Sequence, residues 1–468
     1  MAKTPKVLFV TYSFPPTGGV SVHRVTKFVK YLPEYGWNCS VLTVSNPSVP
    51  LVDDSLLKDI PESTTIVTAK TLEPSYKLKQ LFSGAKSKAP TLANQQASHS
   101  AKPRLIDRLK KLARTTINNW LVPDMQVLWN RNAVKAGLKL LQAEPHDAIV
   151  VTAPPFSSFL VGVELAKQTG LPLILDYRDE WDISNAYWEN KQQNSHALKQ
   201  QAKLQNEILK VADHLVATTP SSTAAVADLA KAVGSKAGAT CIYNGYDADD
   251  FPPAPTTRKD YGNGTEKYRV SYVGTLWNLN SVEPLVQAVE ALHAQSPALC
   301  EQLELVFAGR RTGAQDEILK RLEPLNCHLV RLPFVSHDEA VEMMQTADGL
   351  VLLNSNLPNA NRIVSGKCFE YIAAEKTIYI VSPKGDMWEL LADCPFAFPC
   401  PPDQPLEMTK HLALELERHR LGAQPLTGDW EPKQHERRNR AQQLAEVLNQ
   451  VTDRQPSHAQ PQEAVTCS

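Results

Sequence analysis

The stretch that decides the fold is "KVLFVTYSFPPTGGVSVHRVTKFVKYLPEYGWNCSVLTV", residues 6–44. It begins with a short apolar run, passes through a loop rich in Pro and Gly, and then repeats apolar residues at helical spacing. A second apolar run, residues 38–44, follows directly. This order of strand, helix and strand predicts a βαβ unit, and hence a parallel sheet with helices on both faces.

The alternation of strand-like and helix-like segments continues along most of the 468 residues. Further apolar runs lie at 146–153, 171–177 and 212–218, and a fresh series starts at 268–274. Between the two series, residues 243–264 are rich in Pro, Gly and Asp, which is typical of an interdomain linker. The sequence therefore predicts an α/β protein of two doubly wound, Rossmann-like domains that face a cleft.

Composition sets the expected boundaries and the expected compartment. We expect residues 1–242 to form the N-terminal domain and 265–403 the C-terminal domain, with disorder at about 83–103 and at 452–468. The net charge of −1 gives no global field that would attract nucleic acid or membrane. Eight cysteines without a C-x-x-C pair indicate reduced thiols in a cytosolic setting rather than disulfides or a zinc site.

Loops that follow strands are the candidate binding sites, because ligands of open α/β sheets bind at the carboxyl ends of the strands. Gly18 and Gly19 precede the first helix, where bare backbone can approach a phosphate, although a plain tight turn explains them equally well. Asp176, Arg178 and Asp179 crowd the end of a buried-looking strand. Either they act on a hydroxyl, or an Asp–Arg clamp fixes the loop.

The second half offers a similar set. Gly274 and Thr275 follow one strand, where amides and a hydroxyl can meet a phosphate, and Arg310 and Arg311 follow the next strand. At least one of the two arginines is a candidate diphosphate contact, and a solvated basic pair is the alternative. No His, Asp or Glu set has metal-ligand spacing, and we read "DAD" at 247–249 as solvated linker.

The stretch "RIVSGKCFEY", residues 362–371, contains a local conflict. Lys367 falls in the first turn of a helix that begins near Gly366, where the helix dipole favours acids. A bound anion would remove the conflict, and Glu370, one turn on, can accept two hydroxyls of a ribose. The alternative is a surface ion pair of Lys367 with Glu370.

Together these motifs resemble the GT-B glycosyltransferases, specifically glycosyltransferase family 4 (glycosyl transferase group 1), over most of the chain. Residues 6–43 are similar to the family's opening strand, glycine loop and first helix. "APPFSS", "DYRDEW" and "YNGYD" resemble its N-domain loops and hinge, and "YVGTLW" and "GKCFEYIAAEK" resemble its donor site. The order and spacing of the motifs, rather than any single one, carry the resemblance.

The resemblance implies a retaining, metal-independent transferase of the hexosyl or a related type, with a nucleotide diphosphate sugar as donor and no cofactor. Lys367 would hold the diphosphate and Glu370 the ribose. The full set of expected donor contacts is Lys367, Glu370, Gly18, Gly19, Gly274, Thr275, Arg310, Arg311, Gly366 and Arg362. The expected catalytic residues are Asp179, Asp176 and Arg178. The helical segments at 404–451 would cross back onto the N-terminal domain.

The sequence also departs from the family pattern. Arg362 stands eight positions before Glu370, where the family commonly has a second glutamate. Thr275 and Asn280 occupy the region of the usual Arg and Lys after the first strand of the second domain. Arg310, Arg311 or Arg362 are the cations that can replace them. A sugar-nucleotide epimerase of the same fold and a non-catalytic nucleotide-sugar-binding protein are therefore the alternatives.

The expected acceptor is a glycan or a lipid-linked molecule, the expected pathway is surface polysaccharide biosynthesis in the cytoplasm, and no nucleic acid is expected as a partner. The segment 104–121 is amphipathic, with basic residues on one face. The favoured interpretation is an ordinary helix whose apolar face lies in the core, and peripheral contact with the inner face of a membrane is the alternative.

Overall fold

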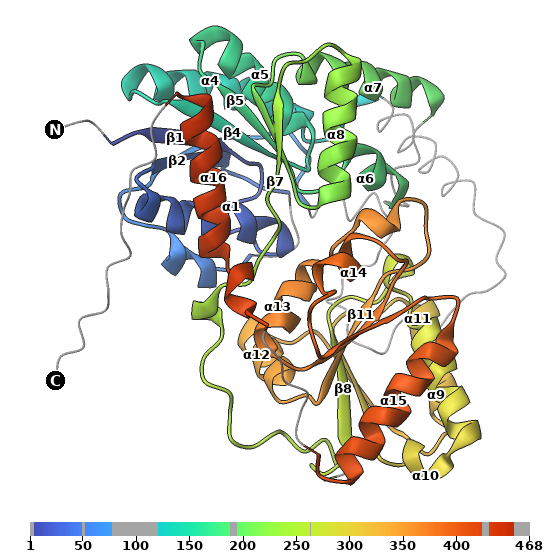
Figure 1. Ribbon diagram of the computed structural model, residues 1–468. Coiled ribbons are helices and arrows are strands. Elements are labelled where there is room, and N and C mark those ends of the chain that lie inside the picture. Colours follow the sequence, from blue (N-terminus) through green and yellow to red (C-terminus); the bar gives the residue numbers. More distant parts are fainter. Residues whose placement is uncertain are drawn as a thin grey trace, which may run out of the picture. The chain divides into compact units, whose positions relative to one another are not determined.

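The computed structural model describes residues 4–48, 52–76, 120–187, 194–262, 264–423 and 430–453. The chain divides into two compact units (Figure 1). Unit 1 runs to Tyr243 and resumes at Arg437, and unit 2 comprises Asn244–Glu436. The expected insertion at 83–103, nearly all of the segment 104–121 and most of the tail at 452–468 lie outside the described residues.

Unit 1 contains a seven-stranded parallel sheet of order β3-β2-β1-β4-β5-β6-β7. The strands are β1 (Lys6–Val10), β2 (Asn38–Val44), β3 (Thr65–Ala69), β4 (Ala148–Ala153), β5 (Leu173–Tyr177), β6 (His214–Ala217) and β7 (Gly238–Cys241). The helices are α1 (Val20–Tyr31), α4 (Val127–Ala143), α5 (Ser157–Thr169), α6 (Trp181–Tyr187), α7 (Ser195–Leu209), α8 (Pro220–Ala232) and α16 (Arg437–Val451).

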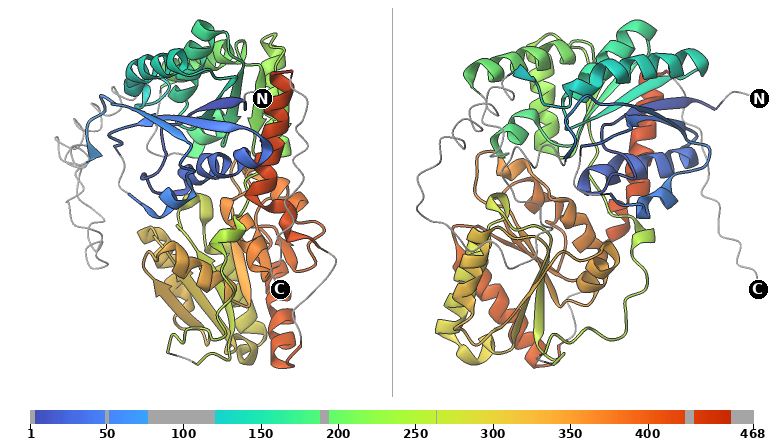
Figure 2. Two further views of the ribbon diagram at one scale, coloured as in Figure 1. Left: turned by 90° about the vertical axis from the view of Figure 1, so that its left-hand side faces the viewer. Right: turned by 180° about the vertical axis from the view of Figure 1, so that it is seen from behind.

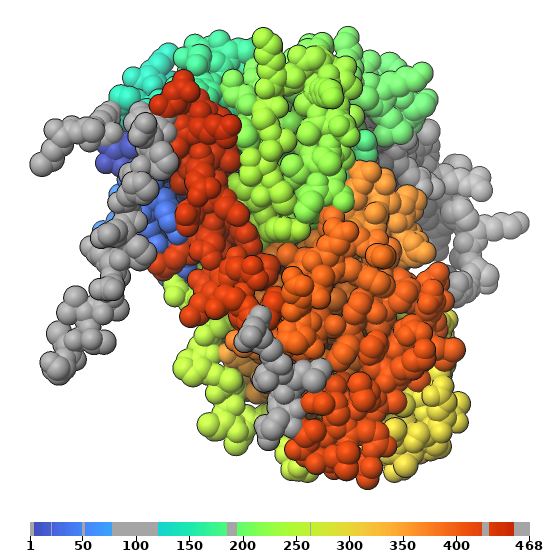
Figure 3. Space-filling model, in the orientation of Figure 1, coloured from blue at the N-terminus to red at the C-terminus, as the bar shows by residue number. Residues whose placement is uncertain are grey.

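Helices cover both faces of this sheet (Figure 2). Alternate residues of β1 enter two separate apolar cores, because successive side chains of a strand point to opposite faces. Leu8 and Val10 join the core that contains residues of α4 and α5, whereas Val7 and Phe9 join the core that contains residues of α1 and α16. The last helix, α16, packs on α1 and keeps one side at the surface of unit 1 (Figure 3).

Unit 2 contains a six-stranded parallel sheet of order β10-β9-β8-β11-β12-β13. The strands are β8 (Tyr268–Val273), β9 (Leu303–Ala308), β10 (His328–Leu332), β11 (Gly349–Leu353), β12 (Thr377–Val381) and β13 (Ala397–Cys400). The helices are α9 (Glu283–Gln295), α10 (Pro297–Cys300), α11 (Gly313–Leu319), α12 (His337–Gln345), α13 (Gly366–Ala374), α14 (Asp386–Leu390) and α15 (Pro405–Arg420).

Two parallel sheets with helices on both faces confirm the expected pair of doubly wound α/β domains. Within unit 2, α15 packs against α9 on one face of the sheet, while α12 and α13 contact each other on the other (Figure 1). We expected both C-terminal helical segments to return to the first domain, yet only α16 belongs to unit 1. Apolar packing explains the difference, because Met408, Leu412 and Leu416 of α15 are buried in the core of unit 2.

No helix among the described residues has the length and apolar character needed to cross a membrane.

Candidate functional site

The carboxyl edge of the sheet in unit 2 carries the candidate donor site. From β8 the chain proceeds outward to β9 and β10 and then crosses to β11 on the other side of β8. The order of the strands therefore reverses between β8 and β11, which is where open α/β sheets bind ligands. The loop after β8 contains Gly274, and the helix after β11 is α13, which carries Lys367 and Glu370.

Lys367 and Gly274 are in direct contact at this point. Gly274 has a φ of +145°, and a Cβ placed on it would lie 2.0 Å from Cε and 2.7 Å from Nζ of Lys367. The lysine side chain thus lies along bare backbone that no other residue type could provide. Its Nζ also stands 5.4 Å from the centroid of the Tyr272 ring. The structure therefore brings together two of the residues that the sequence singled out.

The electrostatic setting of Lys367 favours an anion. The side chain is half-buried, and burial lowers the pKa of its ammonium group, an effect that the nearby Glu370 carboxylate opposes. The first turn of α13 contains no acidic residue, and the N-cap residue Ser365 makes no side-chain capping bond. A cation stands at the positive end of a helix without a counter-charge from that turn.

Gly366 and Gly309 complete the bare backbone of this edge. Gly366 is the first residue of α13. Gly309, after β9, has a φ of +127°, and a Cβ on it would lie 2.2 Å from the carbonyl oxygen of Gly274. The amide of Gly309 donates to the carbonyl of Pro333, after β10, at 3.1 Å. Three neighbouring strands therefore end in one tightly packed set of loops.

Two tyrosines that sequence reasoning missed fix the loop after β8. The hydroxyl of Tyr371, on α13, accepts a hydrogen bond from the amide of Val273 at 3.2 Å. The hydroxyl of Tyr272 donates to the carbonyl of Thr275 at 2.9 Å. Tyr371 thereby ties the helix of Lys367 to the end of β8. The signal for it was present, because Tyr371 closes the "GKCFEY" motif.

Thr275 and Asn280 show what stands in the region of the missing cations. Thr275 is exposed at the end of β8. Asn280 is engaged twice: its side-chain oxygen accepts from the indole of Trp277 at 2.8 Å, and its amide donates to the carbonyl of Leu353. Asn280 therefore holds the loop after β8 against the end of β11 and adds no charge.

Arg311 is bonded to the loops that surround it. Its Nε lies 2.9 Å from a carboxylate oxygen of Asp316, and its Nη1 donates to the carbonyls of Gly309 and Leu332. The side chain is only 6% exposed. These bonds engage Nε and Nη1 and join the loops after β9 and β10, so the role of Arg311 as a diphosphate contact stays a prediction that this geometry does not favour.

Arg310 is instead exposed, and its guanidinium lies over the ring of Phe334, 5.9 Å from the ring centroid. Phe334 follows β10 and is 62% exposed. An exposed aromatic ring at the binding edge of a sheet is a potential stacking platform. Sequence reasoning missed Phe334, although it lies only two residues beyond the end of β10.

Arg362 lies on a short 3₁₀ turn, Ala360–Arg362, just before α13, and is half-buried. A Cβ on Gly385, after β12, would lie 2.2 Å from the carbonyl oxygen of Asn361. The turn is therefore packed against the loop after β12. Arg362 therefore lies on a turn beside the loop after β12, whereas Arg310 lies beside Phe334, after β10.

Asp176 of unit 1, which we expected to be catalytic, is held in a buried ion pair. Arg24, on α1, donates to both oxygens of the Asp176 carboxylate, the shortest distance being 2.9 Å from Nη2 to Oδ1. The hydroxyl of Thr152 donates to the same carboxylate at 2.8 Å. Both charged side chains are only 3% exposed. The structure thus places Asp176 in a buried ion pair, and its catalytic role stays a prediction that this pairing does not favour.

Arg178 does not hold Asp176 either. Its guanidinium donates to the carbonyl oxygens of Ser21, at the start of α1, and of Pro154, after β4. The hydroxyl of Thr218, after β6, donates to the backbone carbonyl of Arg178 at 3.0 Å. Arg178 therefore fixes the loops around the end of β5 and is a positioning residue.

Asp179 is exposed at the carboxyl end of β5, one residue after Arg178. Desolvation by the surrounding protein raises the pKa of its carboxyl group, and the charge of Arg178 opposes this effect. The carboxyl edge of this sheet also includes Gly18 and Gly19. Gly19 has a φ of +106° and is the N-cap residue of α1, whose first turn contains no acidic residue. Bare backbone thus precedes this helix, as a phosphate contact would require.

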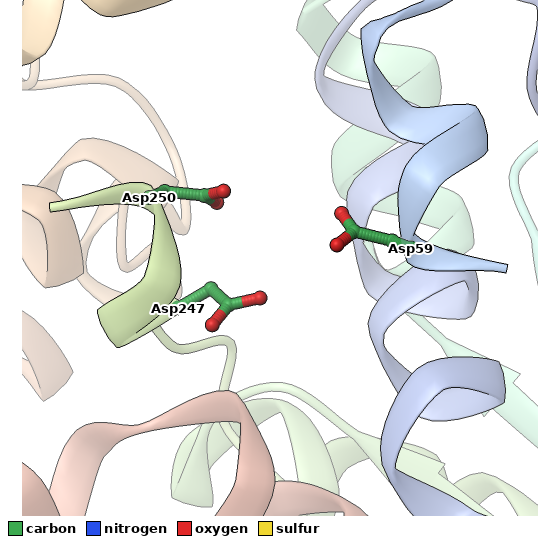
Figure 4. A group of neighbouring side chains, drawn as sticks. All are labelled: Asp59, Asp247 and Asp250. Atoms are coloured by element: carbon green, nitrogen blue, oxygen red, sulfur yellow. The ribbon is translucent and has the colours of Figure 1, made fainter. Parts of the chain in front are cut away.

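Acidic side chains of the expected linker are candidate metal ligands. Asp247 precedes the short turn η3 (Ala248–Asp250), and Asp250 ends it (Figure 4). The Asp247 carboxylate accepts a hydrogen bond from the amide of Asp249 at 3.1 Å. Asp59, also drawn there, ends η2 (Ser55–Asp59) of unit 1, where Lys27 and Lys30 neutralise it at 2.8 and 3.0 Å. We assign no metal to these residues.

Solved structures of similar fold place the chain among the GT-B proteins. Sucrose-phosphate synthase from Thermosynechococcus elongatus is 15% identical, with a TM-score of 0.56 over 96% of this chain and 98% of that chain. WaaG, a glycosyltransferase involved in lipopolysaccharide biosynthesis, is 14% identical, with a TM-score of 0.53 over 94% and 99%. Anabaena HepE in complex with UDP-glucose is 13% identical, with a TM-score of 0.53 over 96% and 97%.

No protein-family model and no curated protein matches the sequence. At these identities the structural likeness establishes the fold, which is the two-domain, Rossmann-like GT-B fold that the sequence predicted. Membership of glycosyltransferase family 4 stays a prediction.

Proposed function

We propose that the protein is a glycosyltransferase that moves a sugar from a nucleotide diphosphate sugar to a glycan or lipid-linked acceptor. The observation that carries this proposal is the Lys367 side chain lying over the bare backbone of Gly274 at the first turn of α13. The GT-B fold adds support, because similar structures include a protein solved with UDP-glucose and a glycosyltransferase.

The diphosphate would bind at the start of α13. The Lys367 ammonium and the uncapped amides of the first helical turn can both donate to its oxygens. The bound anion would also remove the conflict between a lysine and the positive end of a helix. These groups supply positive charge for a leaving diphosphate, which is why we propose transfer without a metal ion.

The nucleoside would extend from this point toward β10. Glu370, one turn beyond Lys367, can accept hydrogen bonds from two ribose hydroxyls. Phe334 follows β10, two strands away from β8, which corresponds to about 10 Å at the usual spacing of strands. Its exposed ring can stack on the base, with Arg310 beside it.

Asp179 is our candidate for the carboxylate that acts on the reacting sugar or on the acceptor hydroxyl. It is the exposed acid of the three charged residues expected to be catalytic, since Asp176 is paired and Arg178 fixes loops. We propose a retaining reaction from the resemblance of the motifs to family 4. The surface-polysaccharide pathway, the cytoplasmic location and the family rest on the same resemblance.

One other function is favoured by a specific observation. Asn280 is neutral and committed to Trp277 and Leu353, so the loop after β8 carries no second cation for the leaving group. A non-catalytic protein that binds a nucleotide sugar would need no such cation. This alternative predicts tight donor binding without turnover.

The test begins with thermal denaturation in a panel of nucleotide diphosphate sugars, because a ligand of the native state raises the melting temperature by mass action. The stabilising donor is then incubated with candidate acceptors, and release of the nucleotide diphosphate is measured. Transfer that requires an acceptor supports the proposal, and release without any acceptor indicates an epimerase or hydrolase instead.

Two variants decide where the donor binds. Lys367→Ala should weaken binding of the nucleotide diphosphate by about tenfold or more, because a charge-assisted contact is lost. Asp179→Asn should abolish transfer while leaving that binding unchanged. Unchanged calorimetric binding in the lysine variant would overturn the donor site. Turnover without acceptor, or binding without turnover, would overturn the transferase.

A further inference from the structure

Two free cysteines of unit 2 meet at the amino edge of its sheet. Cys300 is the last residue of α10, shortly before β9 begins, and Cys327 directly precedes β10. Strands β9 and β10 are neighbours, with His328 opposite Glu304, so both cysteines enter the sheet at the same edge. Their side chains are buried in one apolar core, and their thiols are hydrogen-bonded to each other. We call Cys300 and Cys327 the thiol pair.

The surroundings of Cys300 favour its thiolate. The hydrogen bond from Cys327 contributes most, and the imidazole of His293, on α9, adds to it, so that the pKa of Cys300 is lowered to about 7 although burial opposes this. The same bond raises the pKa of Cys327, whose Sγ also lies 3.9 Å from the carbonyl oxygen of Leu322. The ligand atoms of Cys300, Cys327 and His293 do not all lie within 4.8 Å of one another, so we assign no metal to them. Cys300 is therefore the nucleophile of the thiol pair.

The other buried cysteines of the described chain have a different setting. Burial raises the pKa of each of their thiols, which keeps them protonated and unreactive at neutral pH; they are Cys39, Cys368, Cys394 and Cys400. Cys400 is the best comparison, because it is as fully buried as Cys300 and belongs to the same apolar core. A lowered pKa beside a second thiol therefore distinguishes the thiol pair from ordinary core cysteines.

We propose that the thiol pair is a redox site, which hydrogen peroxide converts into an internal disulfide. The thiolate of Cys300 attacks one oxygen of the peroxide, the O–O bond breaks, and the hydroxide that leaves becomes water with the proton that Cys300 released. The sulfur of Cys327 then attacks the sulfenic acid on Cys300. The S–S bond forms, the S–O bond breaks, and the second hydroxide becomes water with the proton of Cys327. Two thiols are oxidised and one peroxide is reduced to two waters.

The position of the thiol pair determines what the disulfide would do. Helix α10 has only four residues, of which Pro297 and Ala298 are exposed, so a local opening gives a small oxidant access to Cys300. The disulfide would close a loop over residues 300–327 and join α10 to the start of β10. Lys367 and the loops of the proposed donor site lie at the opposite, carboxyl edge of the sheet (Figure 1). Oxidation should therefore stabilise unit 2 without blocking the donor site.

The test is oxidation of the reduced full chain by a small excess of hydrogen peroxide. Mass spectrometry of the unreduced digest should find the peptides of Cys300 and Cys327 joined, with two hydrogen atoms lost, while Cys400 stays reduced. Dithiothreitol should reverse the change. The rate of disulfide formation should rise with pH through about 7, the pKa of Cys300. The melting temperature should rise by about 5 °C or more, because the closed loop constrains the unfolded chain.

Two serine variants separate the roles of the cysteines. Cys327→Ser keeps a hydroxyl donor beside Cys300 but removes the second thiol, so oxidation should leave oxygen on Cys300 and give no gain in melting temperature. Cys400→Ser is the matched control, since it makes the same change in the same apolar core. It should form the disulfide at the rate of the wild type. The melting temperatures of the reduced variants check that each is folded.

Several results would overturn the proposal, and the first of them needs no variant. They are oxidation of Cys400 as fast as that of Cys300 in the wild type, a joined peptide that forms only in urea, and disulfides only between different molecules. Binding of a nucleotide diphosphate should be the same before and after oxidation, and the redox site does not depend on that ligand. Failure of this inference is therefore distinct from failure of the proposed function.

Discussion

Arg24 and Asp176 form a buried, two-pronged ion pair inside unit 1, with 2.9 Å between Nη2 and Oδ1. Arg24 also donates to the carbonyls of Ile242 and Tyr243, at 2.9 and 3.0 Å, just where the chain leaves unit 1. The pair therefore connects α1, β5 and the exit of the chain. A buried arginine and carboxylate with this many bonds are mutually dependent, because either one alone would be an uncompensated charge.

Asp176→Asn should destabilise the protein rather than impair the chemistry. The substitution leaves Arg24 charged and buried, and loss of one partner of such a pair lowers the free energy of unfolding by about 3–5 kcal/mol. Urea denaturation, followed by the fluorescence of the buried Trp37 and Trp129 in unit 1, measures this change. Binding of a nucleotide diphosphate, which we place in unit 2, should be unaffected in the folded variant.

Asp179→Asn is the matched control for that substitution. Asp179 is exposed and lies three residues away, so its replacement should change the free energy of unfolding by about 0.5 kcal/mol or less. A stable Asp176→Asn variant without transfer activity would contradict the structural role assigned to Asp176 and return it to the catalytic group.

Gly274→Ala should weaken donor binding through the position of Lys367. A methyl group at this residue would overlap Cε of Lys367 and would hold an alanine at a φ of +145°. The strain costs about 1–3 kcal/mol, and the lysine must leave its place. We expect an affinity for nucleotide diphosphate at least about tenfold lower, measured by calorimetry.

Gly170→Ala is the control that separates backbone strain from displacement of the Lys367 side chain. Gly170 also has a positive φ, +72°, but a Cβ there would meet nothing within 4 Å. Its replacement should lower stability through backbone strain and leave nucleotide affinity unchanged. If Gly274→Ala bound nucleotide as tightly as Gly170→Ala, the contact between Lys367 and Gly274 would have no role in the donor site.

The two sheets could be predicted from the sequence because each strand is a short apolar run bounded by Gly, Pro or polar residues. The contact of Lys367 with the Gly274 loop could be anticipated for a similar reason, since both residues follow strands and parallel strands end at one edge. Short-range patterns in the sequence are sufficient to predict these strands and the loops that follow them. The conflict at the start of α13 was visible in the sequence alone.

The role of Asp176 could not be predicted in that way. Its neighbour in the sequence, Arg178, points to an Asp–Arg clamp, but its partner is Arg24, 152 positions earlier. Likewise, Arg311 is satisfied by carbonyls of Gly309 and Leu332, which carry no sequence signal. A partner can come from a distant part of the chain, or it can be a backbone carbonyl. In neither case do the residues next to the charged side chain indicate which partner it has.

The pKa of Lys367 predicts that donor binding takes up protons at alkaline pH. Burial lowers this pKa below the usual 10.5, whereas the unfolded chain keeps the usual value. Between the two values the unfolded state binds more protons, so the contribution of Lys367 to stability rises as the pH rises through this range. A bound diphosphate restores the charge and hence the pKa. Affinity should therefore fall as the pH rises through the lowered pKa of the free protein.

Calorimetry in two buffers of different ionisation enthalpy measures this proton uptake directly. The Lys367→Ala variant should show weaker binding and no uptake from this residue. Lys367→Arg keeps a cation that does not titrate in the same range, so its binding should be independent of pH there. An uptake of protons in the alanine variant equal to that of the wild type would assign the titration to another group.

Phe334→Ala should distinguish recognition of the base from recognition of the diphosphate. Stacking of a base on an aromatic ring contributes about 1–3 kcal/mol, so the affinity for a nucleoside diphosphate should fall by roughly 5- to 150-fold. Inorganic pyrophosphate has no base, and its affinity should not change. Lys367→Ala should weaken both ligands, because the lysine contacts the phosphates. If Phe334→Ala weakened pyrophosphate as much as the nucleotide, the ring would support the loops after β9 and β10 rather than the base, since Pro333 beside it accepts the amide of Gly309.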